Sequence, residues 1–147
     1  MLALQGISVS SGVAIGEALV IDYEGFRIPR RFLMRDAVDD ELQRLSSAME
    51  AVAEDIERNR VSIASQLGEK YGAIFAAHLQ VLRDDRLNDE IRRLVLERHY
   101  SPEYAVSRTL RRYAKVFLEL DSAHHAERAQ DIFDIERSLL YYLLGLR

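Results

Sequence analysis

The chain contains no cysteine among its 147 residues. Disulfide bonds and thiol chemistry are therefore excluded, and the composition is compatible with a reducing compartment. No apolar run approaches the roughly 20 residues that a helix needs to cross a bilayer. The N-terminus also lacks the basic stretch and the apolar core of a secretion signal. These absences predict a cytoplasmic protein that does not associate with a membrane.

An excess of basic charge is missing as well, because the formal net charge is −4. No nucleic-acid partner is therefore expected on electrostatic grounds. The acidic residues are unevenly spread: residues 36–67 hold eight acidic and three basic side chains, and the rest of the chain holds 16 and 17. With 48% apolar and 30% charged residues, the chain can form a core and does not have the composition of a disordered segment.

The motifs that usually carry chemistry are absent too. There is no Glu-x-x-His pair of the kind that holds metals in helical bundles. His124 and His125 are adjacent, so on a helix they point roughly 100° apart and cannot easily share one ion. Gly12 and Gly16 lack both the spacing and the following Lys-Ser or Lys-Thr of a phosphate-binding loop. No catalytic residue, metal ligand or cofactor site is therefore expected in this chain.

Residues 1–25 differ from everything that follows, because they hold four of the seven glycines and are rich in Val, Ile and Ser. They predict a short strand at about residues 6–9, a turn at residues 10–12, and a second strand at about residues 14–21. Two strands are marginal in water, and no later segment has a strand pattern. Either they pack on helices, or the chain is part of a longer protein whose sheet lies downstream. Residues 26–35 are expected to form an extended connector, since Pro29 prevents a helix there.

Residues 36–147 have the periodicity of helices. The first helix is expected over residues 36–66, where apolar side chains follow a heptad-like spacing that is interrupted only at Asn59. The second is expected over residues 69–98, with a break at the four charges of residues 83–86. Asp84 or Asp85 can cap the half that follows the break. In the first half, one face carries a mixed set of side chains: Tyr71, Ile74, Phe75, His78 and Leu82.

Two further helices follow. Ser101-Pro102-Glu103 opens the third, and Asp121-Ser122 opens the fourth, which should end at Gly145. Each of the four helices carries a single apolar stripe. This predicts a mainly α chain whose helices form an antiparallel four-helix bundle.

Two side chains allow a structural or a functional interpretation. His78 is either a half-buried histidine hydrogen-bonded to a neighbour, or a residue of a docking or phosphotransfer site. Arg128 either pairs with Asp131 and Asp134 on the helix surface, or meets an anion or the backbone of a partner.

Three separated motifs, which together extend over the chain, resemble one family. The first is Gly6-Ile7-x-x-Ser10-x-Gly12-Val13-Ala14-x-Gly16-x-Ala18-Leu19. The second is Ala73-Ile74-Phe75-x-x-His78-x-x-x-Leu82-x-Asp84-x-x-Leu87-x-x-Glu90-Ile91. The third is Glu127-Arg128-Ala129-x-Asp131-Ile132-x-Asp134-Ile135, followed by Leu143-Leu144-Gly145-Leu146. Together they resemble the N-terminal part of Enzyme I, the phosphoenolpyruvate-protein phosphotransferase of the bacterial sugar phosphotransferase system.

The resemblance implies a function for the parent protein. Enzyme I takes a phosphoryl group from phosphoenolpyruvate onto a histidine, with magnesium, and passes it to the phosphocarrier protein HPr. By this resemblance, residues 1–25 are the first strands of an incomplete swivelling α/β domain, and residues 36–147 are its helical HPr-docking subdomain. The family's Thr-Ser-His-type phosphorylation motif is absent from this sequence. The chain is therefore expected to bind a partner but to be inactive alone, and the parent is expected to be a homodimer through its C-terminal part.

The resemblance also implies a docking surface, with His78 as a docking residue and not as a phosphate carrier. Carried over position by position, this surface comprises Tyr71, Gly72, Ile74, Phe75, His78, Leu79, Leu82, Asp85, Leu87, Phe117 and Arg128. Family members often have glutamate at four positions that differ here: Lys70, Ala76, Arg83 and Arg86. The loss of these carboxylates should weaken the attraction of a basic HPr face and favour a divergent or nitrogen-type phosphocarrier.

A second function remains open at this point. The heptad-like seam of the first helix could pair with another chain, which would make the protein a non-catalytic scaffold or dimerisation module. The N-terminal strand pair separates the two hypotheses, because a scaffold bundle does not need it.

Overall fold

The computed structural model describes residues 11–13, 16 and 28–145. A short 3-10 helix, η1 (Arg35–Ala37), leads into five α-helices. They are α1 (Val38–Leu67), α2 (Glu69–Leu82), α3 (Asp85–Arg98), α4 (Pro102–Glu119) and α5 (Ala123–Leu143). The described part is thus mainly α, as predicted. The predicted strand pair falls almost entirely outside the described residues, which contain no strand beyond a single β-bridge.

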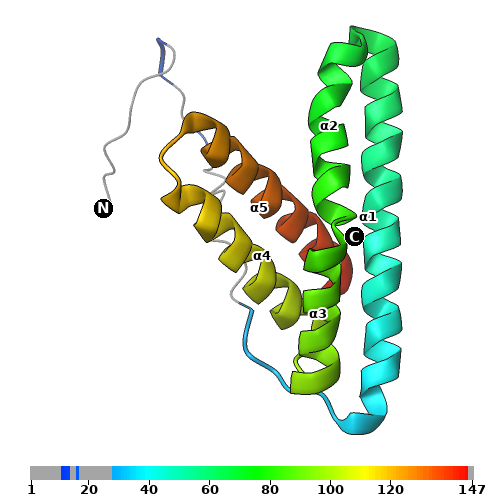
Figure 1. The fold of residues 1–147 in the computed structure, drawn as a ribbon. Helices are drawn as coiled ribbons and strands as arrows, with labels where there is room; N and C mark the ends of the chain where they lie inside the picture. Colours follow the sequence, from blue (N-terminus) through cyan, green and yellow to red (C-terminus); the bar gives the residue numbers. More distant parts are fainter. Residues whose placement is uncertain (1–10, 14–15, 17–27, 146–147) are drawn as a thin grey trace.

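The arrangement of the helices differs from the predicted antiparallel four-helix bundle, which is not confirmed. The interrupted second helix is two separate helices, so that α2 and α3 follow one another along the side of α1 (Figure 1). The α4–α5 hairpin packs against this layer at an incline and contacts α1, α2 and α3 (Figure 1). The break after Leu82 is the physical reason for the difference, because it frees α2 and α3 to pack against different partners.

The core lies where the α1–α3 layer meets the α4–α5 hairpin. The predicted seam of α1 contributes Leu45 and Val52, which are 0% and 1% exposed, together with Ile56. Leu110 of α4 and Ile135 of α5 are buried in the same cluster. The seam of α1 is therefore filled by side chains of this chain.

Side-chain caps set the helix boundaries that the sequence predicts. Asp84 accepts a hydrogen bond from the Leu87 backbone N–H at 2.8 Å and begins α3. Ser101 caps α4 through the Tyr104 N–H, with Pro102 in the first turn, and Ser122 caps α5 through the His125 N–H. Each cap satisfies an amide that the first turn leaves without a partner.

The connector before η1 is held on the loop between α3 and α4. The Leu33 N–H donates to the His99 carbonyl at 2.6 Å, and the Ser101 N–H donates to the Arg31 carbonyl at 2.9 Å. Phe32 and Tyr100 form the antiparallel bridge between these bonds. The described part of the connector is extended and contains no helix before Arg35, as Pro29 predicts; the domain boundaries near residues 25 and 35 stay predictions.

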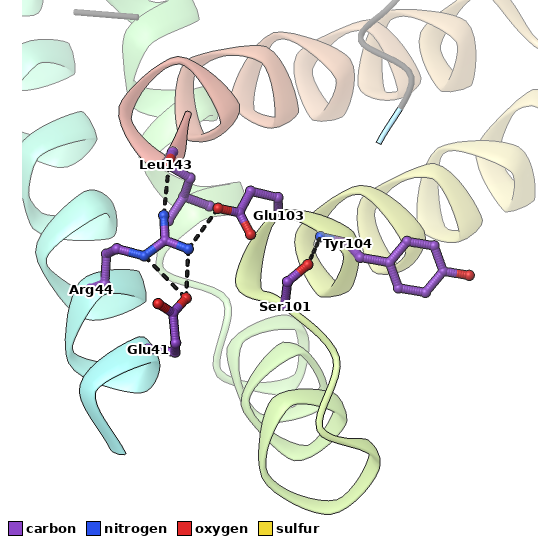
Figure 2. Close-up of polar contacts among 6 residues, drawn as sticks. All are labelled: Glu41, Arg44, Ser101, Glu103, Tyr104 and Leu143. Atoms are coloured by element: carbon purple, nitrogen blue, oxygen red, sulfur yellow. Dashed lines mark hydrogen bonds and ion pairs between the residues drawn. The ribbon is translucent and has the colours of Figure 1, made fainter. Parts of the chain in front are cut away.

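Arg44 of α1 contacts the beginning of α4 and the end of α5 (Figure 2). Its guanidinium donates to the Leu143 carbonyl and to Glu103 at 2.6 Å each, and to Glu41 at 2.6 and 3.1 Å. Burial lowers the pKa of Arg44, but the hydrogen bonds and charges of Glu41 and Glu103 raise it by more, so the net shift is upward. The cation therefore stays charged and holds α1, α4 and α5 together.

Replacement of Arg44 by methionine should destabilise the fold. Glu103 is buried, and it would lose its only ion-pair partner among the described residues. The expected loss is about 2 kcal/mol in the free energy of unfolding, less than for a fully buried pair because Arg44 is about one-third exposed. Denaturant titration of the chain measures it. The control is Arg58→Met, which removes an exposed pair with Asp55 and should cost below about 0.5 kcal/mol. Equal losses for the two variants would show that the Arg44 contacts contribute little.

Candidate functional site

Four of the predicted docking residues are buried, namely Gly72, Leu79, Leu82 and Leu87. Gly72 lies against α1 so closely that a Cβ at this position would be 3.5 Å from Arg60 Cγ and 3.6 Å from Ala64 Cβ. These residues hold α2 and α3 in place. Gly72 and Leu79 can act in docking only by supporting the residues beside them, whereas Leu82 and Leu87 each line a groove.

Tyr71 and Ile74 lie on the outer side of α2, where they are 56% and 55% exposed. Phe75 is half-buried beside them. Two large apolar side chains one turn apart, next to a third, form an exposed apolar surface of the kind that marks interaction sites. We call Tyr71, Ile74 and Phe75 the α2 apolar surface.

His78 continues this side of α2 and connects it to α5. Its Nε2 atom is 3.2 Å from Asp131 Oδ1 and 3.7 Å from Asp134 Oδ2, and its ring meets Phe75 edge-on. The Nε2 atom is buried, but its alignment with the carboxylates is not that of a hydrogen bond. The contact of His78 with the two aspartates is therefore an ion pair when the imidazole is protonated. The structural alternative for His78 predicted a hydrogen bond to a neighbour, and the Nε2 atom forms none.

A mostly apolar groove of about 350 Å³ lies where α2 and α3 meet the α4–α5 hairpin. It brings together three predicted docking residues, Leu87, Phe117 and Arg128. The remaining lining residues were not predicted: Gln80, Val81, Asp84, Tyr113 and Ile132. Tyr113 and Ile132 belong to the apolar stripes of their helices, so the sequence pattern alone assigns them to the core.

The polar side chains of this groove differ in their partners. Arg128 is half-buried and forms no ion pair with any described residue, whereas Asp131 and Asp134 face His78. The pairing of Arg128 with these carboxylates on the helix surface is thus not what the structure shows.

Burial raises the pKa of the Tyr113 hydroxyl, and the charge of Glu90 and a hydrogen bond to Glu90 raise it further. At neutral pH the hydroxyl therefore keeps its proton and donates to Glu90.

Asp85 lies apart from these residues. It lines a second, wider groove of about 1130 Å³ between α1 and the α2–α3 junction, together with Ser46, Met49 and Arg92. The two grooves share no lining residue.

Nowhere among residues 11–13, 16 and 28–145 do three or more His, Asp or Glu side chains form a group that could hold a metal ion. None of the five α-helices is long and apolar enough to cross a membrane.

Truncation at the two kinds of predicted docking residue should affect stability differently. Leu82→Ala should lower the free energy of unfolding by about 2–4 kcal/mol, because Leu82 is 4% exposed and its loss leaves a cavity. Ile74→Ala should change it by less than about 0.5 kcal/mol, because the side chain is already in solvent. Thermal and denaturant unfolding of both variants measure this. A loss of more than 2 kcal/mol in Ile74→Ala would mean that Ile74 belongs to the core.

Comparison with known proteins identifies the family. Residues 5–128 match the family model described as "PEP-utilising enzyme, N-terminal". The chain belongs to this family. It is 33% identical over 143 residues to the phosphoenolpyruvate-protein phosphotransferase of Geobacillus stearothermophilus, which covers 97% of this chain and 24% of the relative. With the enzyme of the same name from Mycoplasma genitalium it is 29% identical over 147 residues, 100% of this chain and 26% of the relative.

Solved structures of this family have the same fold. A solution structure of Enzyme I superposes with a TM-score of 0.76 at 24% identity, over 83% of this chain and 49% of the other. A structure described as the N-terminal domain of Enzyme 1 – Nitrogen gives a TM-score of 0.73 at 24% identity, over 82% and 50%. The resemblance to the N-terminal domain of Enzyme I is thus confirmed. The chain spans about a quarter of the length of its curated relatives.

Proposed function

We propose that this chain is the phosphocarrier-docking part of a phosphoenolpyruvate-protein phosphotransferase of the Enzyme I type, and that its partner is HPr or a divergent homologue. In this proposal the phosphorylated histidine and the site for phosphoenolpyruvate and magnesium belong to other parts of the parent protein. The residues described here bind and orient the carrier, and none of them is catalytic. Family membership supports the proposal for the parent, and the exposed surface of α2 supports it for this chain.

The observation that carries the proposal is the exposure of Tyr71 and Ile74 on a helix whose opposite side is tightly packed on α1. Buried Leu79 and Leu82 anchor α2, so the α2 apolar surface can be presented without a conformational change. An apolar centre with a charged rim is typical of interfaces that form and dissociate readily. A phosphocarrier must leave after each transfer, and such a surface allows this.

The groove and Arg128 extend the proposed surface. An apolar side chain of the partner can enter the groove beside Leu87 and Phe117. Arg128 has no ion-pair partner among the described residues, so its guanidinium is free to donate to a carboxylate or a backbone carbonyl of the carrier. His78, whose ring meets the Phe75 ring edge-on, acts in docking and not as a phosphate carrier.

The observed packing argues against a dimerisation module. That hypothesis was that the heptad-like seam of the first helix pairs with another chain. Leu45, Val52 and Ile56 of this seam are buried in the core, and Leu42 and Met49 pack against it. The seam is therefore not available to a second chain.

Isothermal calorimetry of this chain with unphosphorylated HPr from the same organism tests the proposal. Tyr71→Ala and Ile74→Ala should each weaken binding about fivefold or more, because each removes apolar contact area at the centre of the interface. The matched control is Leu96→Ala on α3, which is also 55% exposed but lies outside the surface. It should leave the affinity within twofold of the unmodified chain.

Two outcomes would overturn the proposal. One is an absence of binding at millimolar HPr. The other is equal weakening by Leu96→Ala and by the two α2 variants, since this would place the interface elsewhere.

A further inference from the structure

The charged side chains around the proposed docking surface fall into two groups, those with partners in the chain and those without. Among the carboxylates, Asp84 caps α3, and Glu90 contacts Arg112 and Tyr113 of α4. Arginines without an ion-pair partner among the described residues include Arg86 of α3, which is next to the groove residue Leu87, and Arg128 of α5, which lines the groove.

Arg86 of α3 directly precedes Leu87, which lines the groove. It is exposed, and it is one turn before Glu90 on the same face of α3. Glu90 is in contact with Arg112 and Tyr113, and Tyr113 lines the groove, so this face of α3 adjoins the groove wall. Glu90 pairs with Arg112, and Arg86 forms no ion pair with any residue of the described ranges 11–13, 16 and 28–145.

Arg128 of α5 lines the same groove. The nearest acidic residues along α5 are Glu127, Asp131 and Asp134, which share another face at i, i+4 and i+7. That face meets His78 of α2. The proposed surface is thus bipolar: carboxylates lie on the His78 side, and two guanidinium groups that have no ion-pair partner in the described part of the chain lie on the side of the groove.

We infer that the docking partner presents aspartate or glutamate side chains opposite Arg86 and Arg128. The inference rests on the proposed docking function and adds to it the charge of the partner opposite these two arginines. A carboxylate opposite either guanidinium group would pair with it, and a basic side chain there would be repelled. The bipolar surface would also fix the orientation of the carrier, because a partner turned around would bring like charges together.

Charge reversal at Arg86 tests the inference in the same calorimetric titration with HPr from the same organism. Arg86→Glu should weaken binding about tenfold at low salt and less at 0.5 M salt, where ions screen the contact. Arg93→Glu is the matched control, since it makes the same charge change at an exposed arginine two turns further along α3. It should leave the affinity within twofold of the unmodified chain. Ile74→Ala is measured alongside.

The possible results separate this inference from the docking function. If Ile74→Ala weakens binding and Arg86→Glu leaves it unchanged or tightens it, the partner is not acidic opposite Arg86 and the inference is wrong, while docking stands. If Arg93→Glu weakens binding as much as Arg86→Glu, the effect comes from net charge and the inference is also wrong. If HPr does not bind, the docking function fails and this inference fails with it.

Discussion

The break between α2 and α3 is the constraint on which the rest of the structure depends. After Leu82 the chain turns, and its freed polar groups find partners close by. Asn88 Nδ2 donates to the Leu82 carbonyl at 3.0 Å, and the Asp84 carboxylate accepts the Leu87 N–H. A continuous helix over the same residues would have to pack a single face against the same neighbouring helices along its whole length. The break allows α2 to pack on α1 and α5 while α3 packs on α1 and α4, and the groove forms at the junction.

The same arrangement explains why a surface for a partner remains. On α2 the side that faces α1 is filled by Gly72 and Leu79, and His78 is covered by α5. Tyr71 and Ile74 lie nearer the α1–α2 turn, and none of the described helices covers them. The hairpin of α1 and α2 thus uses one side for stability and leaves an apolar side for binding. Rigid packing below an exposed apolar surface lowers the entropy cost of docking, since the surface needs no reordering.

Local chemistry explains what the sequence could predict. The helix boundaries follow from Asp84, Ser101 and Ser122, whose caps act within three residues along the chain. The family followed from motifs, which are also local. Local sequence patterns could not predict which of the docking residues are exposed to solvent. Tyr71 and Leu82 share one face by spacing, yet one is 56% and the other 4% exposed, because different helices cover different lengths of α2.

Contacts between distant residues were beyond the sequence pattern. Arg44 contacts residues 59 and 99 positions away, and neither spacing nor composition indicates such a pair. The groove combines side chains of four helices, so Tyr113 and Ile132 could be assigned only to an apolar stripe. Asp85 was predicted to lie in the same surface as Leu87, but the two residues are two positions apart on α3, so their side chains point roughly 200° apart and line different grooves.

The most direct test of the central claim is an NMR map of the surface that HPr covers. The isotope-labelled chain is titrated with unphosphorylated HPr, and the amide shifts are assigned to the helices. The account predicts that shifts cluster on α2 around Ile74 and Phe75, at the start of α3, and on α5 around Arg128. Shifts confined to the wider groove between α1 and α3, around Ser46 and Arg92, would contradict it.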